Sequence, residues 1–124
     1  GCGEDEETDE EIEKKVFNIE ELRDRLLYDN ELLATVVEIF LTEGPGQIEI
    51  LREGIEKEEM DKIEIQAHAF KGAAANTGAE RIRETAEKIE YAAKNKDIRK
   101  IRKLFEKIKE EFLEFKIEIQ NNRR

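Results

Sequence analysis

The chain has 124 residues, of which 38% are hydrophobic and 44% are charged, with one proline and no tryptophan. This length suits one domain with one core, and so charged a composition favours helices that each bury a single apolar stripe. No run of about 18 apolar residues occurs, so we expect no transmembrane helix. The N-terminus is acidic rather than basic and then apolar, so we expect no signal peptide and a cytoplasmic location.

The net charge of −10 is concentrated at the N-terminus. Residues 1–13, GCGEDEETDEEIE, contain eight acidic residues and no basic one, which leaves 24 acids and 22 bases for the rest. An acidic run without apolar periodicity is typical of disordered chain. We therefore expect residues 1–15 to form a disordered tail or linker and residues 16–121 to form the folded domain. The single cysteine, Cys2, lies in this tail and is interpreted as a free thiol.

Two helices are predicted in the first half of the domain. A short helix over about 19–28 follows Asn18, whose side chain can cap its first turn. Asn30 can cap a second helix over about 30–57, whose apolar stripe continues in phase across Gly44-Pro45-Gly46. Pro45 removes a backbone hydrogen bond and crowds the preceding turn, so we expect one long helix with a kink there. A true break at Gly44 is the alternative.

Three further helices follow, over about 59–77, over about 79–94 and from Ile98 onward. Gly78 is a plausible left-handed stop between the first two, and Asp97 can cap the last. Apolar residues recur in steps of three and four along each helix, most regularly in the last, at 98, 101, 105, 108, 112, 115 and 119. Three short stretches such as Lys62-Ile63-Glu64-Ile65 alternate as strands do, but each lies within a longer helical pattern. The predicted fold is all-α, an antiparallel up-and-down four-helix bundle with an extra short N-terminal helix.

Residues 67–79, AHAFKGAAANTGA, contain the only histidine of the chain, His68. Lys71 and Gly72 follow at i+3 and i+4, the positions that neighbour it on a helix surface. Because His68 is one step from the buried stripe, its imidazole should reach solvent at the edge of the core face. A glycine within a helix costs about 1 kcal/mol relative to alanine, and at Gly72 it either exposes the ring or permits close helix packing. An accessible imidazole beside a positive charge suits nucleophilic attack on a phosphoryl group.

This stretch resembles the motif of histidine-containing phosphotransfer (HPt) domains, which is His-x-x-Lys-Gly followed by small residues. The resemblance covers about residues 16–120 and is nearest to HPt modules at the C-terminal end of hybrid sensor kinases. It implies a phosphorelay carrier rather than an enzyme, with His68 as the phosphoacceptor between receiver-domain aspartates. Lys71, Gly72, Glu64 and Ala75 would contact the phosphoryl group and the partner. Glu64, at i−4, would either orient His68 or belong to the plain surface.

The expected partner is the receiver domain of a response regulator or hybrid kinase. We expect Mg2+ at the partner's aspartyl site, no cofactor or metal in this chain, no membrane contact by this domain, and a monomer. The basic cluster at Lys96, Arg99, Lys100, Arg102 and Lys103 lacks an aromatic platform, so we interpret it as a solvated face rather than a nucleic-acid site. Two alternatives stay open. One is a structural or engineered bundle that retains the motif without activity. The other is a chemotaxis-kinase-type phosphotransfer domain that a kinase phosphorylates.

Overall fold

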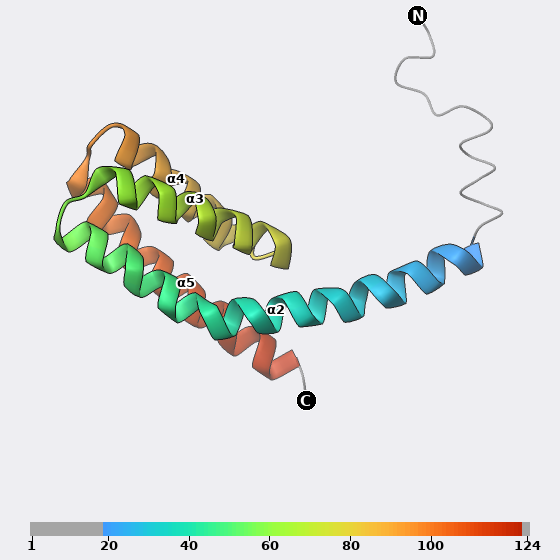
Figure 1. The fold of residues 1–124 in the computed structure, drawn as a ribbon. Coiled ribbons are helices and arrows are strands. Elements are labelled where there is room, and N and C mark those ends of the chain that lie inside the picture. The colour runs from blue at the N-terminus through green and yellow to red at the C-terminus, as the bar shows by residue number, and fades with distance from the viewer. Residues whose placement is uncertain (1–18, 123–124) are drawn as a thin grey trace, which may run out of the picture. The chain divides into compact units, whose positions relative to one another are not determined.

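The computed structural model describes residues 19–122, with side chains from residue 30 onward. The helices are α2 (Ile19–Glu56), α3 (Met60–Thr77), α4 (Glu80–Lys94) and α5 (Ile98–Asn122), and no strand occurs in the described part of the chain. The chain divides into two compact units, residues 1–34 and residues 35–124. The second unit contains the bundle, in which α3 packs on α4 and α4 packs on α5 (Figure 1).

The all-α prediction is confirmed, but the separate N-terminal helix is wrong. Residues 19–28 are helical, yet they continue without a break into the helix that was expected to begin at Asn30. Asparagine disfavours a helix interior by only a few tenths of a kcal/mol, and neither glycine nor proline occurs between Ile19 and Glu43 to end the helix. Asn18 and the acidic tail lie outside the described residues.

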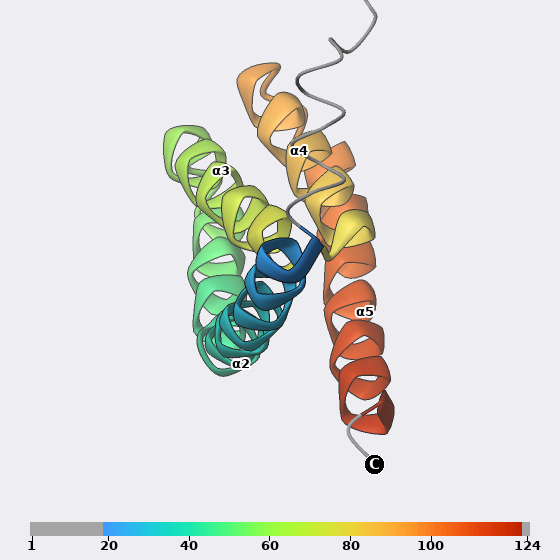
Figure 2. The same ribbon diagram turned by 90° about the vertical axis from the view of Figure 1, so that its right-hand side faces the viewer.

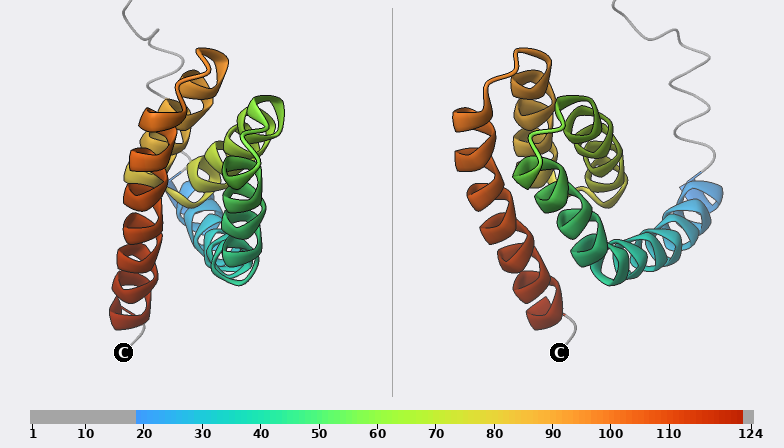
Figure 3. Two further views of the ribbon diagram at one scale, coloured as in Figure 1. Left: turned by 90° about the vertical axis from the view of Figure 1, so that its left-hand side faces the viewer. Right: turned by 60° about the vertical axis from the view of Figure 1, so that its left-hand side comes forward.

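Proline 45 lies inside α2, so the prediction of one helix across this proline is confirmed and the break at Gly44 is not found. The later boundaries agree with the sequence pattern to within one residue. Gly78 ends α3 with φ 74° and ψ 14° in the left-handed region, and an Asp97 carboxylate oxygen accepts the backbone N–H of Lys100 at 3.2 Å. Short turns therefore reverse the chain between successive helices and bring them side by side (Figures 2 and 3).

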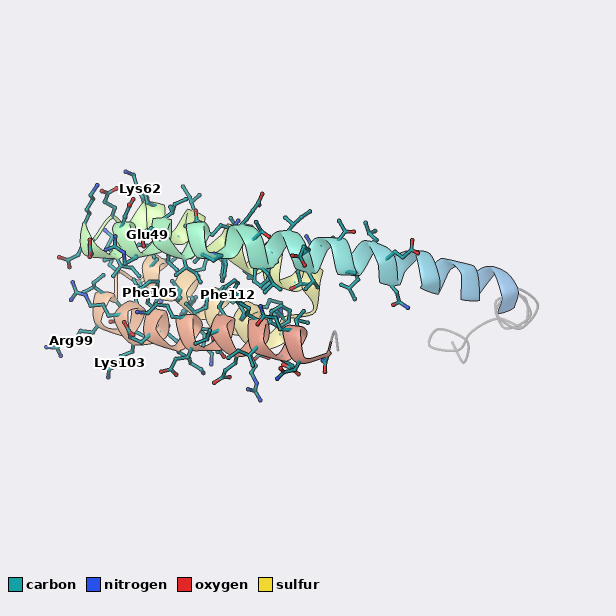
Figure 4. All side chains as sticks on the ribbon, turned by 90° about the horizontal axis from the view of Figure 1, so that it is seen from below. Glu49, Lys62, Arg99, Lys103, Phe105 and Phe112 are labelled. Atoms are coloured by element: carbon teal, nitrogen blue, oxygen red, sulfur yellow. The ribbon has the colours of Figure 1, made fainter. Side chains whose placement is uncertain are left out.

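The apolar stripes meet in one core. Its largest fully buried side chains come from all four helices: Leu51, Ile63, Phe70, Ile82, Ile89, Ile101 and Ile108. At one end of the core the Phe40 ring lies 5.3 Å from the Phe70 ring and 5.4 Å from the Phe112 ring, measured between centroids. Phe105 and Phe112 project from α5 toward α2, whereas Arg99 and Lys103 project away from the bundle (Figure 4).

The packing of α2 on α5 explains one of the two glycines beside Pro45. A Cβ built on Gly44 would overlap the Phe112 ring, whereas a Cβ on Gly46 would meet nothing within 4 Å. Gly44 therefore allows a close approach of the two helices, and Gly46 does not serve that purpose. The rigid packing of the four helices fixes the relative positions of α3 and α4, which together form the candidate site.

Candidate functional site

His68 lies in the middle of α3, on the side that faces α4. Its neighbours in the chain, Ala67 and Phe70, are buried, and they anchor this stretch of α3 in the core. The side chain of His68 is 66% exposed, so the ring projects from the edge of the core face into solvent. This is the position that the helical spacing predicts.

A carboxylate from the neighbouring helix holds one side of the imidazole. His68 Nδ1 lies 2.8 Å from Glu90 Oε2, and Lys71 Nζ donates a hydrogen bond to Glu90 Oε1 at 2.9 Å. The two oxygens of one carboxylate thus bind the histidine and the lysine separately. The Glu90 side chain is only 12% exposed, so solvent screens these two interactions weakly.

The ionisation of Glu90 is set by opposing influences. Burial is the largest single influence and raises the pKa of its carboxyl group. The hydrogen bonds from Lys71 and His68, together with their positive charges, outweigh burial and hold the pKa of Glu90 below its ordinary value. Glu90 is therefore a carboxylate near neutral pH, and a carboxylate can only accept hydrogen bonds.

Glu90 is the site residue that the sequence analysis missed. It lies 22 residues from His68 and on another helix, beyond the reach of a local motif. A weak signal was present, because Glu90 is four residues after the buried Ala86 and three before the buried Ala93. A charged residue at such a semi-buried position requires a partner.

Glu64, which could either orient His68 or belong to the plain surface, is not in contact with the ring. It is partly buried on α3, and in the described part of the chain no hydrogen bond or ion pair joins it to His68, whose ring is bound by Glu90. A glutamate four residues away on the same helix surface makes only a weak pair, whereas Glu90 reaches the ring from across the helix interface.

Small exposed residues follow the histidine along α3. Gly72 and Ala75 are exposed, and a Cβ on Gly72 would meet nothing within 4 Å. The glycine is therefore not required for close helix packing, and it leaves the helix surface next to His68 uncovered. Ala74 is the residue of this run that is buried against the core.

A groove of about 610 Å³ runs between His68 and the exposed face of α4. Its lining combines residues of both charges with one exposed aromatic ring: His68, Lys71, Glu84, Glu87, Lys88, Glu90, Tyr91, Lys94 and Lys100.

Within the described residues, no group of three or more histidine, cysteine, aspartate or glutamate side chains is placed to hold a metal ion. Nor does any helix there combine the length and apolar character of a membrane span.

A match to a protein-family model identifies the family of this chain. The model of the Hpt domain family matches residues 35–121, which is most of the chain. The chain belongs to the Hpt domain family. Hpt domains take part in histidine phosphotransfer within two-component phosphorelays, where they interact with receiver domains and carry phosphoryl groups rather than act as enzymes. The searches of curated proteins and of solved structures gave no match.

Proposed function

We propose that this Hpt domain is a phosphorelay intermediate whose phosphoacceptor is His68. The observation that carries the proposal is the hydrogen bond between His68 Nδ1 and Glu90, formed by a ring that is otherwise 66% exposed. One nitrogen of the imidazole is held within the protein, and the other, Nε2, is left for a partner to reach.

The carboxylate state of Glu90 selects the tautomer of the imidazole. Because Glu90 can only accept, the Nδ1 atom of His68 must carry the hydrogen in their hydrogen bond. In the neutral imidazole, Nε2 then has no hydrogen and presents its lone pair to solvent. Glu90 therefore favours the form of His68 that is nucleophilic on its exposed side.

In the transfer step one bond to phosphorus forms and one breaks, and no proton has to leave the imidazole ring. The Nε2 lone pair attacks the phosphorus of a partner's phospho-aspartate, the N–P bond forms, and the P–O bond to the aspartyl carboxylate breaks. The product is a phospho-imidazolium whose Nδ1–H still points at Glu90, and the carboxylate stabilises its positive charge. Transfer onward to another aspartate is the reverse of these steps, so the same geometry serves both directions.

Lys71 and the small residues have supporting roles in this proposal. Lys71 neutralises Glu90 in the free domain and lines the same groove as His68, where its ammonium group can screen the incoming phosphoryl charge. Gly72 and Ala75 allow the partner's reaction centre to approach the ring. We assign no role in the transfer to Glu64.

The proposed partner is a receiver domain that supplies Mg2+ with its own phospho-aspartate, in the cytoplasm, and the domain acts as a monomer. A kinase of the chemotaxis type is the alternative donor. If neither donor phosphorylates His68, the chain is a structural bundle that retains the motif.

A transfer assay tests the proposal. The chain and its His68→Ala variant are each mixed with a panel of phosphorylated receiver domains and Mg2+. We expect acid-labile, base-stable phosphate on the parent and none on the variant, with helical circular dichroism equal in both. Label on the variant would show that another residue is the acceptor. Labelling by a kinase but by no receiver would favour the alternative donor.

A further inference from the structure

The junction of α4 and α5 carries a positive charge that no ion pair neutralises among the described residues. Residues 94–103, KNKDIRKIRK, contain six basic residues and one acidic residue, a net of +5 in a chain whose total is −10. The single acid, Asp97, is engaged as the cap of α5. Among the described residues, none of the six basic side chains forms an ion pair, whereas Arg52, Lys62, Lys71 and Arg83 all do.

The part of this charge that lies on α5 is placed against the helix dipole, whereas Lys94 lies in the last turn of α4, where a basic side chain stabilises the helix. The first turns of α5 contain Arg99, Lys100, Arg102 and Lys103, and its first turn has no acidic residue. The N-terminal end of a helix carries a partial positive charge, so acidic side chains stabilise it and basic ones destabilise it. Unpaired bases at this end weaken the fold, and binding of an anion would relieve that cost.

Two of these six basic residues lie beside His68. Lys94 from the last turn of α4 and Lys100 from the first turns of α5 both line the groove that contains the histidine. Glu84, Glu87 and Lys88 line it as well, about two to three turns before Lys94 along α4, and both of these acids pair with Arg83. Since His68 contacts Glu90, it lies between these acids and the two lysines along the length of α4. The end of the groove just beyond the histidine therefore carries two lysines that form no ion pair among the described residues.

We propose that Lys94 and Lys100 form a docking site for an acidic surface beside the phospho-aspartate of the partner protein. This inference rests on the proposed function. A phospho-aspartyl centre that binds Mg2+ needs carboxylates around it, because Mg2+ takes oxygen ligands from carboxylates and phosphates. Such a centre presents negative charge at its rim, which complements the positive end of the groove.

The test reverses the charges of Lys94 and Lys100 and compares the effect with that of reversing the charges of two lysines outside the groove. The variant is Lys94→Glu/Lys100→Glu, and the control is Lys57→Glu/Lys107→Glu, which alters two exposed lysines that form no ion pair in the described residues and do not line the groove. Both variants have the same net charge. The readout is the second-order rate of transfer from a phosphorylated receiver that labels the parent, measured from low to high ionic strength.

At low salt we expect the groove variant to transfer about tenfold more slowly than the parent, because complementary charge acts mainly on association. The control should stay within about twofold of the parent. The difference should close at about 1 M salt, where the screening length falls to roughly 3 Å. At saturating receiver, the rate of the transfer step itself should be equal in parent and groove variant.

Three outcomes would overturn the inference. Equal second-order rates for the groove variant and the parent would remove these lysines from the docking surface while leaving the proposed function intact. Binding of a labelled DNA duplex by the parent, lost in a groove variant whose transfer rate is normal, would assign the positive charge to nucleic acid. Failure of every receiver to label the parent would overturn the proposed function, and this inference with it.

Discussion

Glu90 on α4 binds His68 Nδ1 and Lys71 Nζ through its two carboxylate oxygens, at 2.8 and 2.9 Å. The histidine and the lysine of one local motif are thus organised by a third residue from the next helix. The motif supplies the reactive group and a charge, and the packing of α3 on α4 supplies the orientation of the ring. Substitutions at Glu90, Lys71 and Gly72 separate these contributions.

The first prediction concerns the charge of Glu90. Glu90→Gln retains the shape and an acceptor for Nδ1–H but loses the negative charge that stabilises the phospho-imidazolium. Charge-assisted hydrogen bonds exceed neutral ones by about 1–2 kcal/mol, so we expect phosphoryl transfer to slow by about tenfold. Glu80→Gln is the control, because this exposed residue of α4 pairs with Arg83 rather than with His68 and does not line the groove. Equal transfer rates for Glu90→Gln and the parent would remove the electrostatic role of Glu90.

The second prediction concerns the pH dependence of stability. The pKa of Glu90 is below its ordinary value of 4.5 in the folded domain, so its contribution to stability is present above pH 4.5 and is lost as the pH falls through the folded pKa. Lys71→Met removes one of the groups that lower this pKa. We expect it to reduce the free energy of unfolding by about 1–2 kcal/mol at pH 7.

The difference between parent and Lys71→Met should then shrink once the pH falls through the lowered pKa of Glu90, because protonation of its carboxyl group removes the pairing in the parent as well. Urea unfolding followed by circular dichroism at several pH values measures it. A difference that stays constant while Glu90 is protonated would mean that Lys71 stabilises the bundle by a route other than its pairing with Glu90.

The third prediction separates stability from access at Gly72. Because a Cβ there meets open space, Gly72→Ala should raise the free energy of unfolding by about 1 kcal/mol. Gly72→Leu should also fold, but it should slow transfer at least tenfold by covering the imidazole, a loss of about 1.4 kcal/mol or more in transition-state stabilisation. Gly46→Leu is a matched control, since Gly46 is also an exposed helical glycine with open space around it. Normal transfer by Gly72→Leu would remove the access argument.

The fourth prediction concerns the opposite kind of glycine. Gly44→Ala should destabilise the domain by about 1–3 kcal/mol, because its methyl group would overlap the Phe112 ring within the aromatic cluster. Thermal unfolding measures the change. The double variant Gly44→Ala/Phe112→Leu should show a coupling between the two positions, since the smaller side chain makes room for the methyl group. Additive effects of the two changes would contradict the proposed overlap.

The fold could be predicted from the sequence wherever one periodic signal was sufficient. The spacing of three and four residues from Ile98 to Ile119 gave the buried face of α5, and local chemistry identified Gly78 as the stop of α3 and Asp97 as the cap of α5. The boundary at Asn30 was wrong because capping preference alone does not end a helix. A residue must also make continuation costly, as Gly78 does through its left-handed backbone.

The site could be predicted only in part. His68, Lys71 and Gly72 lie within five residues, so helical geometry was sufficient to place them together. Glu90 could not be selected among 32 acidic residues, because its role depends on the register between α3 and α4. That register is set by the packing of many apolar side chains across the interface, and no local pattern in the sequence specifies it.

The position of the phosphorus on the imidazole ring tests the central claim most directly. The chain, labelled with ¹⁵N in its histidine, is phosphorylated by a receiver domain that transfers to it, and the ¹⁵N–³¹P coupling is recorded by NMR. Because Glu90 holds Nδ1, the account predicts a bond from phosphorus to Nε2 of His68. A bond to Nδ1, or phosphate on any other residue of the chain, would contradict it.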